Sequence, residues 1–151
     1  MRNLLFLTLL ATPGVSAAQA IQPGRWDVVS TMADLAVPGA PGFIVRMMKG
    51  KSKAEHKCVT PDQAKTGVAA LLAPDPKAQC HVDSLQIAGG RYAQTLTCPQ
   101  KKGPPMQLSR SGTYDAAGFA GRVKLAGPTP KGPMTATIDQ RTTHLTGTCR
   151  G

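Results

Sequence analysis

The chain has 151 residues, a formal net charge of +10 and 4% aromatic residues. This length suits a single domain, and no apolar segment is long enough to cross a bilayer as a helix. We therefore expect a protein that does not span the membrane. A basic surface attracts anions in general, so the compartment decides which anions the protein can meet.

Residues 1–20 predict a cleavable signal peptide. One arginine follows Met1, the run from Leu4 to Leu10 is apolar, and residues 18–20 read Ala-Gln-Ala, the small-x-small pattern of a cleavage site. Cleavage there leaves 151 − 20 = 131 residues, and we expect residues 21–151 to form one domain. Because an exported protein is separated from nucleic acid, we expect no nucleic-acid partner, and instead lipid, an anionic envelope surface or another envelope protein.

The first part of the mature chain predicts two strands joined by an irregular segment. Arg25–Thr31 reads as a strand, and Val37–Gly42 is rich in Pro and Gly and should be a loop. Phe43–Lys49 fits either a short helix or an apolar flap. Glu55–Val59 fits a second strand.

One helix is expected after these strands. Thr60 is a good N-cap, Pro61 suits the first helical position, and Gln63 completes a capping box. Apolar residues then recur at helical spacing as far as Leu72, and Pro74 ends the pattern.

The rest of the chain alternates apolar and polar residues between short turns, which is typical of antiparallel strands. A hairpin joins Cys80–Ile87 to Arg91–Cys98. The sequence therefore predicts a mainly β domain: an antiparallel up-and-down meander of about eight strands, forming a curled sheet or barrel, with one short α-helix. The four further strands are expected at Met106–Tyr114, Phe119–Leu125, Met134–Asp139 and Thr143–Cys149.

Four cysteines allow three disulfide pairings. If residues 88–90 form the hairpin turn, facing residues have numbers that sum to 178. Cys80 and Cys98 then lie opposite each other, close enough for a disulfide. This leaves Cys58 to pair with Cys149. A redox or zinc site would need close-spaced cysteines, which are absent, so we expect two structural disulfides in an oxidising compartment.

Several segments together resemble a known family. They are the Pro-Gly-Arg-Trp opening at residues 23–26, Cys-Val-Thr-Pro-Asp-Gln at 58–63, Gly-Thr-Tyr at 112–114 and Thr-Gly-Thr-Cys at 146–149. The chain resembles the bacterial secreted proteins of domain-of-unknown-function family 3617 over the whole mature region. The resemblance implies a small exported protein of Gram-negative bacteria, and hence a periplasmic location. It implies no activity and no catalytic residue.

Catalysis and metal handling are less favoured interpretations. No nucleophile elbow, zinc-protease motif or phosphate loop occurs, so we expect no enzyme and no cofactor. A hydrolase would need a pocket in which His56, His81 or His144 meets a carboxylate. A metal-handling or stress-related envelope protein is the alternative, because Met47 and Met48 lie near His56 in sequence and such ligands suit Cu(I).

The favoured interpretation is a non-enzymatic envelope protein that binds an apolar or anionic ligand or another envelope component. The segment from Phe43 to Met48 is apolar and is flanked by Lys and Arg. Such a segment could cover an apolar ligand or contact an anionic membrane surface, and its other reading is ordinary core packing. The candidate contact residues are Phe43, Ile44, Arg46, Met47 and Met48.

Overall fold

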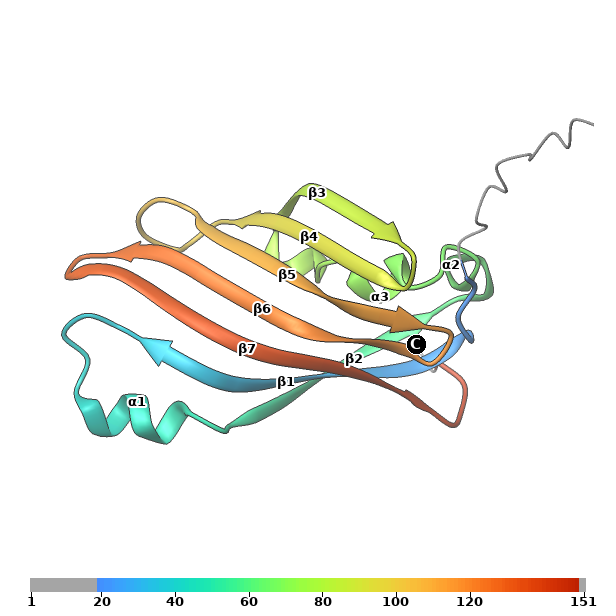
Figure 1. The fold of residues 1–151 in the computed structure, drawn as a ribbon, viewed down its shortest axis with the longest axis horizontal. Helices are drawn as coiled ribbons and strands as arrows, with labels where there is room; N and C mark the ends of the chain where they lie inside the picture. Colours follow the sequence, from blue (N-terminus) through green and yellow to red (C-terminus); the bar gives the residue numbers. More distant parts are fainter. Residues whose placement is uncertain (1–18, 150–151) are drawn as a thin grey trace, which may run out of the picture.

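The computed structural model describes residues 19–149, so most of the predicted signal peptide lies outside the described residues. Seven antiparallel strands form one sheet, and three short α-helices and a 3-10 turn lie between them (Figure 1). The strands are β1 (Gly24–Ala36), β2 (Ser52–Val59), β3 (His81–Ala88), β4 (Arg91–Cys98), β5 (Met106–Asp115), β6 (Gly118–Thr129) and β7 (Gly132–Leu145). The helices are α1 (Gly42–Met48), α2 (Pro61–Ala64), α3 (Ala69–Leu72) and η1 (Pro76–Ala78).

The strand order is β2-β1-β7-β6-β5-β4-β3. Except for β2 and β3, strands that follow one another in the chain pair with each other, and β1 also pairs with β7. The predicted antiparallel meander is therefore confirmed, in the form of an open, curled sheet. The barrel alternative is wrong, because β2 and β3 remain edge strands and residues 60–80 form the connection between them.

The sheet has seven strands rather than eight. The two strands expected at the C-terminus are one continuous strand, β7, which pairs with β1 and β6. No Gly or Pro interrupts it between Met134 and Leu145, and Gln140 and Thr142 continue the inward alternation. β1 also extends beyond the predicted Thr31 to Ala36, because β7 offers hydrogen-bonding partners along its whole length.

The predicted helix after Thr60 is broken into two. The capping box is present: the Thr60 hydroxyl accepts from the backbone N–H of Gln63, and the Gln63 side chain accepts from the N–H of Thr60. However, α2 ends at Ala64, and Gly67 adopts a φ of 67°, which a right-handed helix does not allow. α3 then begins at Ala69, so the apolar positions that suggested one helix occupy two separate turns.

These two helices pack on the concave face of the sheet, toward one end (Figure 1). Leu71 and Leu72 of α3 are fully buried, and Trp26 of β1 is 1% exposed. The indole N–H of Trp26 donates to the carbonyl oxygen of Gln22 at 2.9 Å, so its one polar atom is satisfied. The buried core consists of Ile21, Trp26, Val28, Val59, Ala64, Val68, Leu71, Leu72, Tyr92 and Phe119.

Both predicted disulfides are present, Cys58–Cys149 and Cys80–Cys98. The strand register predicted for Cys80–Cys98 is confirmed at the cysteines, although the predicted three-residue turn at residues 88–90 is wrong. Gly89 and Gly90, with φ of 58° and 74°, form a two-residue turn, which shifts the pairing by one residue. A bulge at Asp83 restores the predicted register, so Val82 pairs with Leu96 and the two cysteines beyond them meet.

We expect the Cys58–Cys149 bond to stabilise the fold more than the Cys80–Cys98 bond. The first closes a loop with a sequence separation of 91 residues and the second one of 18. Chain entropy assigns about 4.6 kcal/mol to the longer loop and about 3.2 kcal/mol to the shorter one. Urea unfolding of the two double Cys→Ser variants measures the difference, and a larger loss for the Cys80–Cys98 pair would contradict it.

Candidate functional site

Helix α1 places the predicted contact residues on the surface. None of its residues is buried, and Phe43 and Met47 are 66% and 58% exposed. Ile44 and Met48 are also exposed, and Arg46 adds a positive charge to the last turn. The helix alternative for this segment is thus confirmed, and the alternative in which it packs into the core is wrong. We call Phe43, Ile44, Arg46, Met47 and Met48 the α1 surface.

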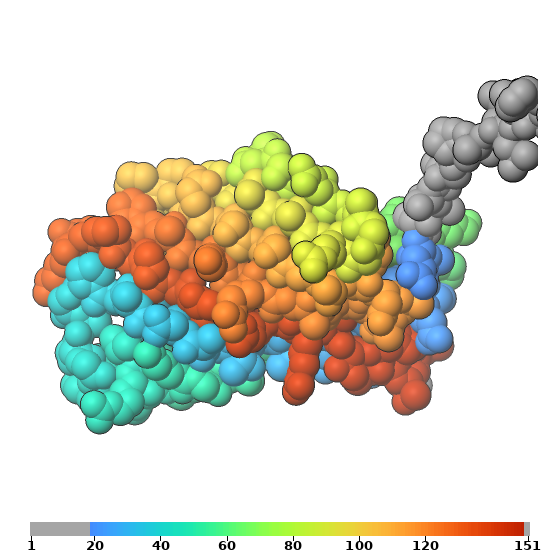
Figure 2. Space-filling model, viewed as in Figure 1, coloured from blue at the N-terminus to red at the C-terminus, as the bar shows by residue number. Residues whose placement is uncertain are grey.

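The backbone after α1 is held against β1. The backbone N–H of Gly50 donates to the carbonyl oxygen of Met32 at 2.8 Å. The backbone N–H of Met32 donates to the carbonyl oxygen of Lys51 at 2.9 Å. Lys49 pairs with Asp34 at 2.6 Å. These contacts fix the helix at one corner of the molecule, at the end opposite to α2 and α3 (Figures 1 and 2). The α1 surface is therefore exposed on a segment that is itself anchored.

The three histidines are not brought together. His56 on β2 contacts Asp27 at 2.5 Å, and His81 on β3 contacts Asp83 at 2.9 Å. Both imidazoles and Asp83 are exposed, whereas the Asp27 side chain is 19% exposed. His56 borders a hollow beside the Cys58–Cys149 disulfide, and both sulfur atoms there are bonded, so neither is a free thiol nucleophile. Serine is absent from the lining of that hollow.

The residues of the metal alternative lie on different elements. Met47 and Met48 belong to α1, whereas His56 lies on β2 and contacts Asp27. Within residues 19–149, no three His, Cys, Asp or Glu side chains are grouped closely enough to hold a metal ion.

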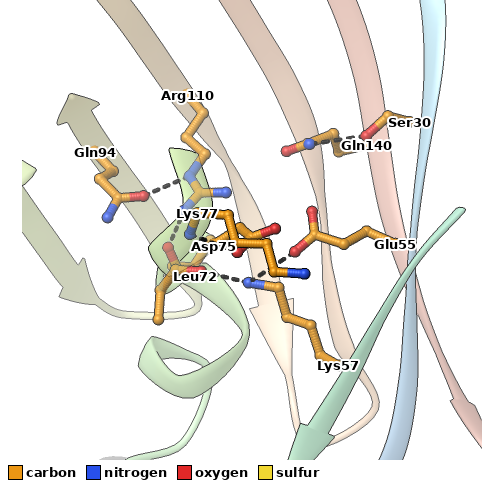
Figure 3. Close-up of polar contacts among 10 residues, drawn as sticks. Ser30, Glu55, Lys57, Leu72, Asp75, Lys77, Gln94, Arg110 and Gln140 are labelled. Carbon is orange, nitrogen blue, oxygen red and sulfur yellow. Dashed lines mark hydrogen bonds and ion pairs between the residues drawn. The ribbon is translucent and has the colours of Figure 1, made fainter. Parts of the chain in front are cut away.

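The concave face of the sheet holds a second candidate site, which the sequence analysis missed. Side chains from β1, β2, β4, β5 and β7 converge there beside the end of α3 (Figure 3). We call this set the polar band. It consists of Ser30, Glu55, Lys57, Gln94, Arg110 and Gln140.

Arg110 is the central cation of the polar band. Its Nε–H donates to the side-chain oxygen of Gln94, and its terminal nitrogen donates to the carbonyl oxygen of Leu72 at the end of α3 (Figure 3). Gln94 is 2% exposed. A guanidinium carries five N–H donors, so these two bonds leave others free. Among the described residues, no carboxylate lies within ion-pair distance of Arg110.

Lys57 is the second cation of the polar band. Its ammonium donates to the carbonyl oxygen of Ala73, and it lies 3.8 Å from a carboxylate oxygen of Glu55. Arg110 and Lys57 therefore both bind backbone carbonyls at the C-terminus of α3, where positive charge is favourable. This arrangement fastens α3 to the sheet, with the carboxylates of Glu55 and Asp75 close enough to Lys57 to favour its charged form (Figure 3).

Burial shifts the pKa values of both cations in the same direction. Desolvation lowers the pKa of Arg110, and the charges of Tyr92 and Glu55 oppose that shift. Desolvation also lowers the pKa of Lys57; Glu55 raises it, and the neighbouring charge of Arg110 lowers it further. Each charge is thus less favourable here than in water, which is the condition in which an added anion stabilises a site most.

Two buried polar atoms, one within the polar band and one beside it, lack a hydrogen-bond partner among the described residues. They are the hydroxyl oxygen of Tyr92 and the side-chain oxygen of Gln140. Gly112 and Gly121 lie between these residues in one cross-strand row. A methyl group on Gly121 would clash with the Tyr92 hydroxyl, so the phenol extends over this glycine toward Gln140. Because Gly112 and Gly121 have no side chains, they leave the space that the Tyr92 ring occupies.

A sequence signal for the polar band exists in the alternation itself. Arg110 occupies an inward position between Leu108 and Gly112, and Gln94 occupies one between Tyr92 and Leu96. Polar residues at inward positions of neighbouring strands indicate an internal polar site. Their convergence on one point, however, depends on pairing register and sheet curvature.

Comparison with known proteins adds a family. The model for DUF3617, described as a protein of unknown function, matches residues 21–149. The chain belongs to this family. No curated protein and no solved structure matches it. Within the part that the structure describes, no helix has the length and apolar character needed to cross a membrane.

We expect replacement of Glu55 by Gln to lower the pKa of Lys57 further, because the Glu55 carboxylate favours the charged ammonium. The folded pKa of Lys57 lies below its ordinary value of 10.5, so the unfolded chain binds more protons between the two values. The free energy of unfolding of the wild-type protein therefore rises with pH between the folded and the unfolded pKa of Lys57. NMR titration of the Lys57 Cε resonance in both proteins measures the shift, and an unchanged or higher midpoint in the variant would refute it.

Gly112→Ala should destabilise the fold. A methyl group at residue 112 would clash with the carbonyl oxygen of Ala120 on β6, and overpacking of this kind costs about 1–3 kcal/mol. Gly42→Ala is the control, because a methyl group on Gly42 in α1 has nothing within 4 Å. Urea unfolding compares the two, and equal stabilities would show that the sheet relaxes freely around residue 112.

Proposed function

We propose that this protein is an exported, non-enzymatic periplasmic protein that binds an anionic lipid surface of the envelope through the α1 surface. The observation that supports it is that α1 buries none of its residues while four large apolar side chains are exposed on it. A group of exposed apolar side chains rimmed by polar residues is typical of a membrane or partner contact.

The charge around α1 favours an anionic surface over a neutral one. Arg46 lies in the helix, and Lys51 and Lys53 follow it along the chain. Each basic residue near an anionic membrane contributes roughly 1 kcal/mol, and the whole chain has a formal charge of +10. The apolar side chains then enter the boundary between head groups and acyl chains.

Export is supported by three observations that are independent of α1. Residues 1–20 have the pattern of a signal peptide. Two disulfides are consistent with an extracellular or periplasmic protein. The family match begins at residue 21, directly after the predicted cleavage site.

The test is flotation of the mature protein with vesicles that contain anionic phospholipid, beside vesicles of zwitterionic lipid. Phe43→Asp/Met47→Asp should remain folded and bind at least about tenfold more weakly, because each buried apolar side chain contributes roughly 1.5–3 kcal/mol. Leu85→Asp is the control, since Leu85 is 39% exposed on β3. Added salt should weaken wild-type binding.

Two results would overturn the proposal. One is wild-type binding by the double variant, which would place the contact elsewhere. The other is equal binding of wild-type protein to anionic and zwitterionic vesicles, which would remove the role of charge. If wild-type protein binds neither vesicle but is captured by an envelope protein through the α1 surface, the partner is a protein and not lipid.

A further inference from the structure

We propose that the concave face of the sheet is a second binding site, which takes a single-chain amphiphile with an anionic carboxylate or phosphate head group. The head group binds at Arg110 and Tyr92, and the tail lies across β6, β7 and β1. This site is separate from the α1 surface and does not depend on the function proposed for it.

Arg110 supplies the reason for an anionic head group. Arg110 is partly buried, and a charge removed from water is normally paired, yet the hydrogen-bond acceptors of this guanidinium are a neutral amide and a neutral carbonyl. Its remaining N–H donors are arranged as a fork that matches a carboxylate or a phosphate. Lys57 adds a second positive charge nearby; the carboxylates of Glu55 and Asp75 act on Lys57, whereas neither is within ion-pair distance of Arg110.

Tyr92 supplies a second and independent contact. It is 3% exposed, and its hydroxyl has no hydrogen-bond partner. Leaving a buried hydroxyl unpaired is unfavourable, so a bound acceptor would supply the missing hydrogen bond. The hydroxyl lies over Gly121, and Tyr92 pairs with Gly112, two residues from Arg110 on β5, so the two side chains lie in adjacent rows of the same face. Both donors therefore serve the same small region.

The apolar residues beyond Arg110 supply the place for the tail. Along the row that starts at Arg110, the register pairs Val123 with Ile138 and Ile138 with Met32. The next row pairs Leu125 with Ala136 and Ala136 with Leu35.

These residues lie outside the core cluster around Trp26. Ile138, Met32, Leu125 and Leu35 are partly exposed, whereas Val123 and Ala136, which share the two rows with them, are each 4% exposed. The tail therefore contacts the four partly exposed side chains, and α2 and α3 cover the other half of the sheet (Figure 1). Strands lie about 4.8 Å apart, so the path from β5 to β1 is about 14 Å long. That distance is the scale of a fatty acyl chain.

The geometry also excludes other head groups. A cationic amphiphile would be repelled by Arg110 and Lys57. An uncharged head group would leave the guanidinium without a counter-ion, and a small anion without a tail would gain nothing from the apolar rows. The site therefore requires both parts of the ligand.

Isothermal titration calorimetry of the mature protein tests this with four probes, each below its micelle concentration. Laurate and dodecyl phosphate represent the two head groups, dodecyltrimethylammonium the opposite charge, and acetate the head group alone. We expect 1:1 binding of laurate, dodecyl phosphate or both, and at least tenfold weaker binding of the other two probes. The stronger anionic probe identifies the head group.

Arg110→Gln should weaken binding of the anionic probe at least tenfold, and Tyr92→Phe about fivefold. Arg141→Gln is the matched control, because it removes an exposed arginine on the other face of β7 and should leave affinity unchanged. Far-UV circular dichroism establishes that each variant is folded. Wild-type affinity in folded Arg110→Gln, or equal losses in Arg110→Gln and Arg141→Gln, would overturn the proposal.

Wild-type protein gives a test that requires no variant. In an NMR titration with laurate, the Arg110 Nε–H signal and the amide signals of Val123 and Ile138 should shift together and saturate at one equivalent. Shifts confined to Phe43–Met48 would overturn this site and would leave the α1 surface as the lipid contact. The two proposals can therefore fail separately.

Discussion

The structure depends on the packing of α2 and α3 against one half of a curled sheet. Trp26, Leu71 and Leu72 are almost fully buried in this contact. Because residues 60–80 connect β2 to β3 and cross the concave face, those two strands do not pair and the sheet stays open. A closed barrel would bury its interior uniformly. Here one half of the interior is covered by helices, and the other half is left to the sheet alone.

The polar band lies where α3, the second of the two helices on the concave face, ends. The last carbonyl groups of a helix need partners, and α3 ends above the middle of the sheet, where only side chains can supply them. Arg110 and Lys57 do so for Leu72 and Ala73. These two hydrogen bonds use only part of the donor capacity of Arg110 and of Lys57. A long-chain anion could use the rest, so one pair of residues can both anchor the helix and define a ligand site.

The exposed α1 surface and the concave site lie on different parts of the same scaffold. The disulfides support this scaffold at its two edges. Cys58, near the end of β2, bonds Cys149, which follows β7. Cys80, just before β3, bonds Cys98 at the end of β4. The β2 edge is thereby tied to the segment after β7, and the β3 edge to β4. Edge strands held in this way are less free to pair with another chain, which allows an open sheet to persist with one half of its face uncovered.

Sequence alone determined what depends on local pattern: the alternation of the strands, the capping box at Thr60 and the Cys80–Cys98 pairing, which left Cys58 to pair with Cys149. The first three features are set by residues close in the chain or by strand pairing across a short turn, and the Cys58–Cys149 bond followed by elimination. Whether Phe43–Met48 is exposed or packs as core was decided by the structure. Only the tertiary structure decided that Gly67 splits the helix, that β7 is continuous and that β2 and β3 stay apart. It also decided that Arg110, Lys57 and Tyr92 meet, because their convergence depends on curvature and register summed across several strands, and no single segment encodes that sum.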